Sequence, residues 1–246
     1  MSRRFFVSAP VTENRVQLGA SERQHLVQAL RGREGDHVVL FDGSGFEFTA
    51  RVVGISRSSV DLEVLARHDI DRELGAPITL GVALPKGDRQ RWLIEKAAEL
   101  GVACLVPLVT ERGVAQPVSK VIERLTRYVI EAAKQCGRNR LMQVASPLAA
   151  ADFFERAPSD SLRVVAHPGH SAVPIVSLAQ PAGDTSIYLA VGPEGGFTDD
   201  EVRAATAWHV VSLGRRILRV ETAALALTAY FSLTDASGRD AMDHHE

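Results

Sequence analysis

The sequence predicts an α/β protein in which a mainly parallel sheet follows a small β-barrel. Residues 1–72 contain short apolar runs separated by frequent turns, whereas from residue 78 onward apolar strands alternate with amphipathic helices. The length of 246 residues suits two domains. We expect these domains at 1–72 and 73–246, with the boundary inside the charged stretch 69–77 that ends in Gly-Ala-Pro.

The first 72 residues have the pattern of a small barrel with one helix inserted. Asp42–Gly45 has the composition of a hairpin turn. Ser21 and Gln24 form a capping-box pattern, which predicts the start of the helix. The five predicted strands cover residues 5–7, 15–18, 37–41, 47–53 and 60–65.

The rest of the chain has the alternating pattern of a parallel α/β sheet. Thr198 followed by Glu201 predicts the start of one helix. Residues 237–246 are polar and are expected to be frayed. The predicted strands cover residues 78–84, 103–109, 162–166, 187–191 and 210–213, and the other predicted helices cover 88–100, 118–136 and 222–233.

Composition places the chain among soluble globular proteins. Apolar residues make up 46% and charged residues 24%, which excludes wholesale disorder. No apolar run has the roughly 18 residues of a membrane span, and no signal peptide is indicated. Two cysteines cannot form a disulfide framework, so a cytoplasmic location is expected. The net charge of -2 argues against a general nucleic-acid coating protein, but it allows a local basic patch.

The first segment that suggests chemistry is the glycine-rich run 191–197, Val-Gly-Pro-Glu-Gly-Gly-Phe. It follows a predicted strand, and α/β sheets bind ligands at the carboxyl ends of their strands. Its glycines allow a close approach of the backbone to a ligand. The spacing matches neither a dinucleotide fingerprint nor a P-loop, so a dinucleotide or triphosphate is not indicated. A tight turn that needs positive φ is the structural alternative.

The second segment covers residues 213–223 and also follows a predicted strand. Gly214 permits another close backbone approach. Arg219 is suited to holding a phosphate, and Glu221 to holding a ribose hydroxyl or shifting the pKa of a neighbour. An ion pair between Arg219 and Glu221 explains the same spacing equally well.

Two further signals are weaker. Arg138 and Arg140 follow the predicted helix 118–136, where cations either stabilise the helix dipole or bind phosphate. His167 and His170 suggest a metal site, but no acidic or cysteine cluster accompanies them, so no metal is expected.

Together these segments resemble one family, the 16S ribosomal RNA uridine N3-methyltransferases of the RsmE type in the SPOUT superfamily. The most specific features are Gly-Pro-Glu-Gly-Gly and Leu-Gly-Arg-Arg-Ile-Leu-Arg-Val-Glu-Thr-Ala. Gly113 departs from the pattern, because a small polar residue is expected there. The resemblance extends over nearly the whole chain and is carried by residues 3–7, 41–43, 95–102, 131–138, 192–197 and 213–223.

The resemblance implies a more specific fold than periodicity shows. The first domain is expected to be a PUA-like β-barrel that helps to hold RNA. The second is expected to be a SPOUT-like parallel sheet with a C-terminal trefoil knot that binds S-adenosylmethionine, in a protein that acts as a homodimer. The expected cofactor-binding residues are His167, Val191, Gly192, Glu194, Gly195, Gly196, Leu213, Gly214, Ile217, Leu218 and Arg219.

The activity that the resemblance implies is methylation of N3 of a specific uridine in the 16S rRNA of the small ribosomal subunit. Arg219 is expected to orient the nucleotide or stabilise developing charge, Glu221 to fix Arg219 or a ribose hydroxyl, and Arg138 to act from the dimer partner. Glu194 and Glu221 are the candidate proton acceptors beside solvent. The expected RNA-binding residues are Arg3, Arg4, Lys86, Arg138 and Arg140.

Two alternatives to this activity stay open. A SPOUT methyltransferase of the same fold acts on another RNA base or on ribose. A non-catalytic ribosome-assembly factor uses the same barrel and arginines to hold RNA, without a cofactor.

Overall fold

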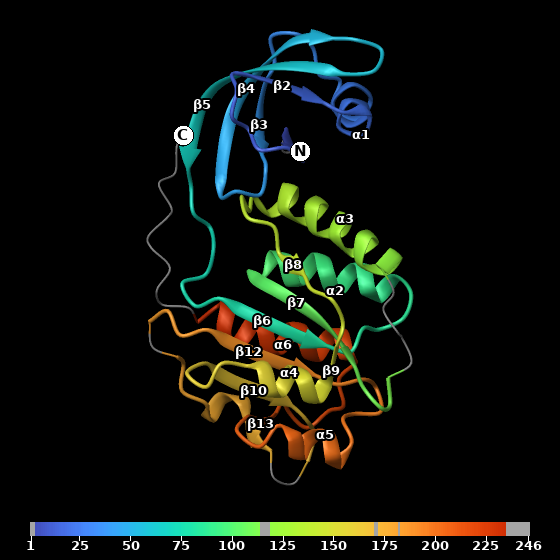
Figure 1. Ribbon diagram of the computed structural model, residues 1–246, viewed down its shortest axis with the longest axis vertical. Coiled ribbons are helices and arrows are strands. Elements are labelled where there is room, and N and C mark those ends of the chain that lie inside the picture. The colour runs from blue at the N-terminus through green and yellow to red at the C-terminus, as the bar shows by residue number, and fades with distance from the viewer. Residues whose placement is uncertain (1–2, 114–118, 170–171, 182, 235–246) are drawn as a thin grey trace. The chain divides into compact units, whose positions relative to one another are not determined.

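The computed structural model describes residues 3–113, 119–169, 172–181 and 183–234. The chain divides into two compact units (Figure 1). The first contains Met1–Glu73 and Ile130–Leu141, and the second contains Leu74–Val129 and Met142–Glu246. The expected domain limits at residues 72 and 73 stay a prediction, to which the structure adds the return of residues 130–141 to the first unit. The expected frayed end and His170 lie outside the described residues.

The first unit is built on a curled five-stranded sheet. The strands lie in the order β1-β3-β4-β5-β2, with β1 parallel to β3 and the other neighbours antiparallel. Two register shifts between β4 and β5 increase the local bend of the sheet. The strands are β1 (Arg4–Phe6), β2 (Arg15–Leu18), β3 (His37–Phe41), β4 (Phe46–Ile55) and β5 (Val60–Asp69).

The predicted hairpin turn at Asp42–Gly45 is confirmed between β3 and β4. The Asp42 carboxylate accepts hydrogen bonds from the backbone N–H and the hydroxyl of Ser44. Gly43 and Gly45 both have positive φ. These two features explain why the segment carries aspartate and glycine.

Alternating side chains along β4 show how the core of the first unit forms. Phe48, Ala50 and Val52 are buried, whereas Arg51 between them is exposed. Helix α1 (Ala20–Gln24) leads into a π-helical turn, η1 (His25–Ala29), which adds the fully buried Leu26 to this core.

The start of α1 differs from the prediction. Gly19 is the N-cap, and no side chain caps the helix. A capping side chain must belong to the extended residue before the first turn, and here that residue is Gly19, with φ −71° and ψ 176°. Ser21 lies inside the helix, so the expected capping box with Gln24 was wrong.

The second unit is built on an eight-stranded sheet in which every pair of neighbours is parallel, which confirms the predicted fold class. The order is β11-β13-β10-β12-β6-β7-β8, and β9 pairs with β7. The strands are β6 (Ile78–Val82), β7 (Val102–Val109), β8 (Gln143–Val144), β9 (Leu148–Ala149), β10 (Leu162–Ala166), β11 (Val173–Pro174), β12 (Ile187–Val191) and β13 (His209–Ser212).

Helices cover this sheet in two layers (Figure 1). Helices α2 and α6 pack together, with α6 on β6 and β12, while α4 and α5 pack together, with α4 on β7 and β9. The boundary between the units falls within α3. The helices are α2 (Asp88–Glu99), α3 (Ser119–Cys136), α4 (Ala150–Arg156), α5 (Asp199–Ala204) and α6 (Val220–Ser232), with a 3-10 turn η2 (Ile175–Ser177). Among the described residues, no helix combines the length and apolar character that a membrane crossing needs.

Helix α4, which the sequence analysis missed, packs on the sheet through an aromatic cluster. Phe154 and Trp208 contact edge to face with ring centroids 5.0 Å apart, and Phe153 lies 5.6 Å from Trp208. A Cβ on Gly81 would lie 2.5 Å from the Phe153 ring. Glycine in the middle of β6 therefore lets α4 approach the sheet closely.

The register of the strands aligns the carboxyl ends that matter for the site. Ala166, the last residue of β10, pairs with Val191, the last residue of β12, and with Val211 near the end of β13. The three loops that follow these strands therefore leave the sheet at one edge, where parallel sheets bind ligands.

Candidate functional site

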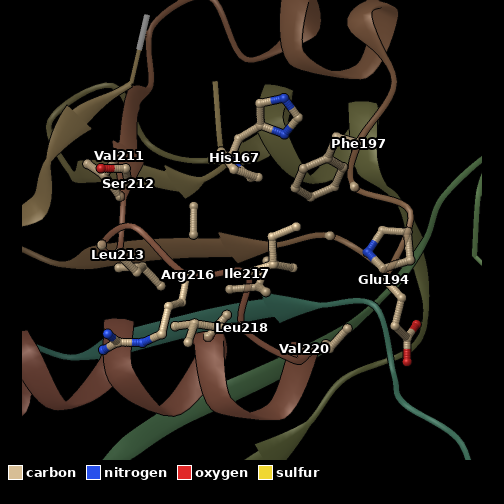
Figure 2. Close-up of a pocket in the computed structure, with 18 residues that line it drawn as sticks. His167, Glu194, Phe197, Val211, Ser212, Leu213, Arg216, Ile217, Leu218 and Val220 are labelled. Atoms are coloured by element: carbon tan, nitrogen blue, oxygen red, sulfur yellow. The ribbon is translucent and has the colours of Figure 1, made fainter. Parts of the chain in front are cut away.

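Three loops at this edge of the second unit enclose a pocket (Figure 2). The loops follow β10, β12 and β13, and the first turn of α6 completes the wall. Its ionisable side chains are His167, Glu194 and Arg216, and the rest of the lining is mostly apolar. The lining residues are Ala166, His167, Pro168, Val191, Gly192, Pro193, Glu194, Gly196, Phe197, Val211, Ser212, Leu213, Gly214, Arg216, Ile217, Leu218, Val220 and Ala223.

The loop after β12 is a tight turn that also lines the pocket. The N–H of Gly196 donates to the Pro193 carbonyl at 2.8 Å, and Gly196 has a φ of 71°. A Cβ on Gly192 would lie 3.0 Å from the Phe197 ring. The tight turn with positive φ, which is the structural alternative to a ligand-binding role for this segment, is thus present. It also brings backbone groups to the pocket wall.

Helix α5 and the loop after β7 hold this turn in place. Thr198 and Glu201 form the predicted capping box, with bonds of 3.3 Å and 2.8 Å. Glu201 also accepts a hydrogen bond from the Glu111 N–H at 3.0 Å. Arg112 donates to the Gly195 carbonyl at 2.9 Å. The glycine turn is therefore anchored from two sides.

Gly113, which departs from the family pattern, closes the loop after β7. Its N–H donates to the Thr110 carbonyl at 3.1 Å. A Cβ on Gly113 would lie 2.6 Å from the hydroxyl oxygen of Thr110, which is buried. A larger residue would have to displace Thr110, and this explains the glycine. Val114 lies outside the described residues.

His167 is a neutral side chain in the pocket wall. Its backbone N–H donates to the Val211 carbonyl at 3.0 Å. Burial lowers the pKa of its imidazole below 6.5, while Asp199 raises it and Arg112 lowers it by smaller amounts. Its Nδ1 is buried and has no hydrogen-bond partner among the described residues. This nitrogen is therefore available to a ligand.

An arginine that the sequence analysis missed connects the pocket to α6. The guanidinium of Arg89, in the first turn of α2, lies 3.3 Å from a carboxylate oxygen of Glu194 and 3.6 Å from one of Glu221. The Glu221 side chain is 8% exposed and that of Glu194 is 52% exposed. Glu221 thus pairs with Arg89, in place of the Arg219 that the spacing suggested.

The structure brings most of the expected cofactor residues to this pocket. Gly195 and Arg219 are absent from its described lining, because Gly195 faces Arg112 and Arg219 is exposed at the N-cap of α6. Glu221 is buried and also does not line it. The binding roles stay predictions. The expected residues that do line the pocket are His167, Val191, Gly192, Glu194, Gly196, Leu213, Gly214, Ile217 and Leu218.

Two of the expected RNA-binding arginines are buried inside the first unit. Arg4 pairs with Glu47 at 2.8 Å and donates to the carbonyl of Arg138 at 3.2 Å. Arg138 donates through Nε to Glu73 at 3.0 Å. The side chains of Arg4 and Arg138 are 6% and 5% exposed. Both charges are thus already paired inside the unit, whereas the expected roles of Arg4 and Arg138 toward RNA and a dimer partner stay predictions.

The other expected RNA-binding residues lie at the surface. Arg3 pairs with Asp36 at 2.9 Å, and the exposed Arg140 guanidinium lies against Gly45. Lys86 is exposed in the second unit, just before α2. Their contacts with RNA stay predictions.

Three arginines near the site were missed, for different reasons. Arg216 lies inside the motif 213–223, so its place next to the ligand loop was a usable signal. Arg89 and Glu194 are 105 residues apart, and no local pattern links them. Arg112 acts through a backbone carbonyl, which leaves no trace in side-chain chemistry.

The fold and pocket together define an α/β protein with a small-molecule site at the carboxyl ends of its parallel strands. Residues 72–232 match the RNA methyltransferase domain family, and residues 18–65 match the RNA methyltransferase PUA domain. The chain belongs to this RNA methyltransferase family.

Several relatives resemble the chain over most of its length. It is 35% identical to the ribosomal RNA small subunit methyltransferase E of Synechocystis sp., over 87% of this chain and 71% of that protein. It is 33% identical to the Bacillus subtilis protein of the same name, over 85% and 86%.

Two solved structures share the fold. The Neisseria gonorrhoeae ribosomal RNA small subunit methyltransferase E bound to S-adenosyl methionine has a TM-score of 0.86 and 30% identity, over 95% of this chain and 98% of that chain. A Legionella pneumophila methyltransferase with bound SAM gives the same TM-score, identity and coverage. The expected SPOUT-type sheet with a PUA-like first domain is thus confirmed, while the trefoil knot stays a prediction.

Replacing Arg89 by alanine is expected to destabilise the second unit by about 1–3 kcal/mol, because the buried Glu221 loses its ion-pair partner. Urea unfolding followed by tryptophan fluorescence measures this change, since Trp92 and Trp208 both belong to the second unit.

Two variants control this measurement. Glu221→Gln in the Arg89→Ala background removes the unpaired charge and should recover most of the loss. Lys96→Ala removes an exposed pair with Glu99 in the same helix and should cost less than about 0.5 kcal/mol. Equal losses in the single and double variants would refute the role given to this ion pair.

Proposed function

We propose that the protein transfers a methyl group from S-adenosylmethionine to N3 of a specific uridine in the 16S rRNA of the small ribosomal subunit. The observation that carries this proposal is the glycine-walled pocket at the ends of β10, β12 and β13, in a chain of the RNA methyltransferase family. The relatives named for small-subunit rRNA methylation supply the substrate class.

The pocket has the chemistry that S-adenosylmethionine requires. The cofactor carries a net positive charge, an adenine ring and ribose hydroxyls, but no phosphate. The pocket offers apolar faces, backbone groups at the glycine turns, the Glu194 carboxylate and the neutral His167 with a buried, unpartnered Nδ1. Figure 2 shows the guanidinium of Arg216 on the opposite side of the pocket from Glu194. The apolar faces, the backbone groups, the Glu194 carboxylate and the neutral His167 fit a cationic, phosphate-free ligand.

When bound, S-adenosylmethionine supplies the methyl carbon, and the electron pair of the broken C–S bond leaves with the neutral thioether. The chain's own residues orient the reactants and exclude water. The apolar walls and the anchored glycine turn do both, because they enclose the pocket and fix its backbone groups.

The nucleotide must give up the N3 proton so that its lone pair can form the N–C bond, and it must be unpaired to expose N3. Glu194 lines the pocket, whereas Glu221 is buried against Arg89, so Glu194 is the better placed of the two candidate acceptors. The exposed Arg219 guanidinium, at the N-cap of α6 after the cofactor loop, is suited to orienting the nucleotide or stabilising its developing negative charge.

The first domain, at residues 1–72, serves to hold the RNA, and the second, at 73–246, carries out the reaction. The match to an RNA methyltransferase PUA domain at 18–65 supports this division. Arg3 and Arg140 are two exposed arginines of the first unit, and a guanidinium is suited to binding phosphate. The protein acts in the cytoplasm, as part of rRNA processing and ribosome biogenesis.

A second copy of the chain completes the enzyme as a homodimer. An apolar groove runs along α6 and is lined by Ile175, Leu213, Ala226, Ala229, Tyr230, Leu233 and Thr234. Leu233 is 79% exposed, Val176, which follows the groove residue Ile175 in sequence, is 77% exposed, and Ile217 in the cofactor loop is 92% exposed. Exposed apolar side chains in such a group are typical of an interface, and Leu213 belongs to both the groove and the cofactor pocket.

Incubating the protein and labelled S-adenosylmethionine with unmodified small subunits is expected to produce 3-methyluridine in 16S rRNA, detected by nucleoside mass spectrometry. If another methylated nucleoside forms, the protein is still a methyltransferase, but the assignment of uridine N3 as its target is rejected. If the protein does not incorporate label and does not bind the cofactor in calorimetry, the result favours the non-catalytic assembly factor.

In the same assay, Arg219→Ala is expected to lower kcat by at least about tenfold and to leave the cofactor Kd unchanged, since it removes a contact to the nucleotide. Arg203→Ala, at an exposed arginine of α5 paired with Asp200, serves as the control and should behave as wild type. Unchanged methylation by Arg219→Ala would remove the role given to this residue.

Affinity for S-adenosylmethionine is expected to fall as the pH drops below about 6.5, through the lowered pKa of His167. The sign follows from charge: above this pKa the ring is neutral, and below it a proton places a positive charge beside a cationic ligand. Calorimetry from pH 5 to 8 measures the effect. S-adenosylhomocysteine lacks the sulfonium and should respond less, and His167→Gln should abolish the difference between the two ligands. If the two ligands still respond differently to pH in His167→Gln, the pH dependence belongs to another ionisable group.

Leu233→Asp is expected to convert the homodimer to a monomer in sedimentation velocity, because it places a charge in the apolar groove. Leu65→Asp, at an exposed leucine of the first unit, serves as the control. A wild-type protein that sediments as a monomer would reject the homodimer.

A further inference from the structure

A second pocket adjoins the cofactor pocket in the same unit. It lies where β6 and β7 end, and it is lined by Ala83, Leu84, Lys86, Leu108, Gly113, Pro193 and Glu194. In the sheet, β12 stands between β10 on the side of the first pocket and β6 on the side of the second. The two pockets are therefore neighbours along one edge of the sheet.

The wall between the pockets is the dipeptide Pro193–Glu194, which lines both of them. It is held on both sides, because the Ala83 N–H donates to the Val191 carbonyl at 3.0 Å and Arg89 pairs with Glu194 at 3.3 Å. Figure 2 shows the Glu194 carboxylate at the edge of the cofactor pocket, pointing away from His167. The carboxylate is thus placed at the border that a transferred group must cross.

The second pocket combines an apolar floor with two opposite charges. Ala83, Leu84 and Leu108 are 4%, 7% and 2% exposed, so their side chains offer a dry surface to one face of a flat ring. Lys86 supplies an ammonium group and Glu194 a carboxylate. A ligand that fits is a flat heterocycle with an N–H donor and carbonyl acceptors on one edge.

We propose that this second pocket holds the uracil ring of the target nucleotide, swung out of its strand. Uracil carries an N3–H between two carbonyl oxygens, so the Glu194 carboxylate accepts from N3–H while the Lys86 ammonium donates to a carbonyl oxygen or to the nucleotide's phosphate. This assignment rests on the proposed function, and it identifies where the base binds and what selects it.

The same two charges discriminate between pyrimidines. Cytosine has an unprotonated N3 that only accepts hydrogen bonds, so it meets the Glu194 carboxylate with no donor at that position. Glu194 keeps its pair with Arg89, so the discrimination comes from the hydrogen bond that uracil makes and cytosine does not, and from the two acceptors that face each other when cytosine binds. The pocket thus selects uridine over cytidine.

Calorimetric titration of the full-length wild-type protein, saturated with S-adenosylhomocysteine, tests the pocket directly. Uridine 5′-monophosphate is expected to bind at least about fivefold more tightly than cytidine 5′-monophosphate. Lys86→Ala should weaken uridine monophosphate binding about tenfold without changing the cofactor Kd. Lys96→Ala, which removes a lysine on α2 outside the pocket lining, is the matched control and should bind as wild type.

A second variant fills the pocket. Ala83→Leu is expected to abolish methylation of small subunits while leaving cofactor binding within about twofold, which also shows that the second unit is folded. Loss of cofactor affinity in Lys86→Ala would assign this pocket to the cofactor and overturn the proposal. Equal affinity for the two nucleotides, or wild-type kinetics in both variants, would overturn it as well.

The subunit assay separates this inference from the function on which it rests. If wild-type protein forms no 3-methyluridine, the proposed function fails, whereas preferential binding of uridine monophosphate that depends on Lys86 still supports the pocket. If 3-methyluridine forms but neither variant affects binding or kcat/KM, the function stands and the pocket assignment fails.

Discussion

The site depends on one constraint, the common register of parallel strands β10, β12 and β13. Because Ala166, Val191 and Val211 are paired across the sheet, the loops that follow them begin at the same height. Three segments that are far apart in the sequence can then form one wall. A shift of one residue in any of these pairings would turn the side chains of the shifted strand to the other face of the sheet, and it would move the loop that follows this strand away from the other two loops.

Each unit contains ion pairs that join residues far apart in its sequence, but these pairs have different consequences in the two units. In the second unit, Arg89 connects a buried carboxylate of α6 to the exposed Glu194 of the pocket wall. In the first unit, Arg4 and Arg138 are enclosed with their carboxylate partners. The Arg89 pairs connect α2 to the pocket wall, whereas the Arg4 and Arg138 pairs join segments within the first unit, where Arg138 holds Glu73 through two nitrogens.

Sequence reasoning found what is encoded locally. Strands β10 and β12 begin and end at the predicted residues, and the Thr198 cap is present, because hydrophobic runs and capping patterns are short-range signals. The glycine motifs led to the pocket because a tight turn and a pocket wall both require glycine. Helix α4 was missed since it has only seven residues and no side-chain cap. The burial of Arg138 could not be foreseen, because Glu73 lies 65 residues away and nothing near Arg138 indicates that partner.

The first unit is discontinuous, and this has a consequence for its synthesis. The side chain of Asn139 donates to the carbonyl of Ile70 at 2.8 Å and also contacts Arg4. When the ribosome has made the five strands, Arg138 and Asn139, which contact Arg4, are still to be translated, and residues 74–129 of the second unit come before them. The nascent sheet must therefore persist with a hydrated Arg4 until residue 139 emerges. The two units thus complete their folding in an interleaved order, and the N-terminal segment becomes fully native only after α3 has been made.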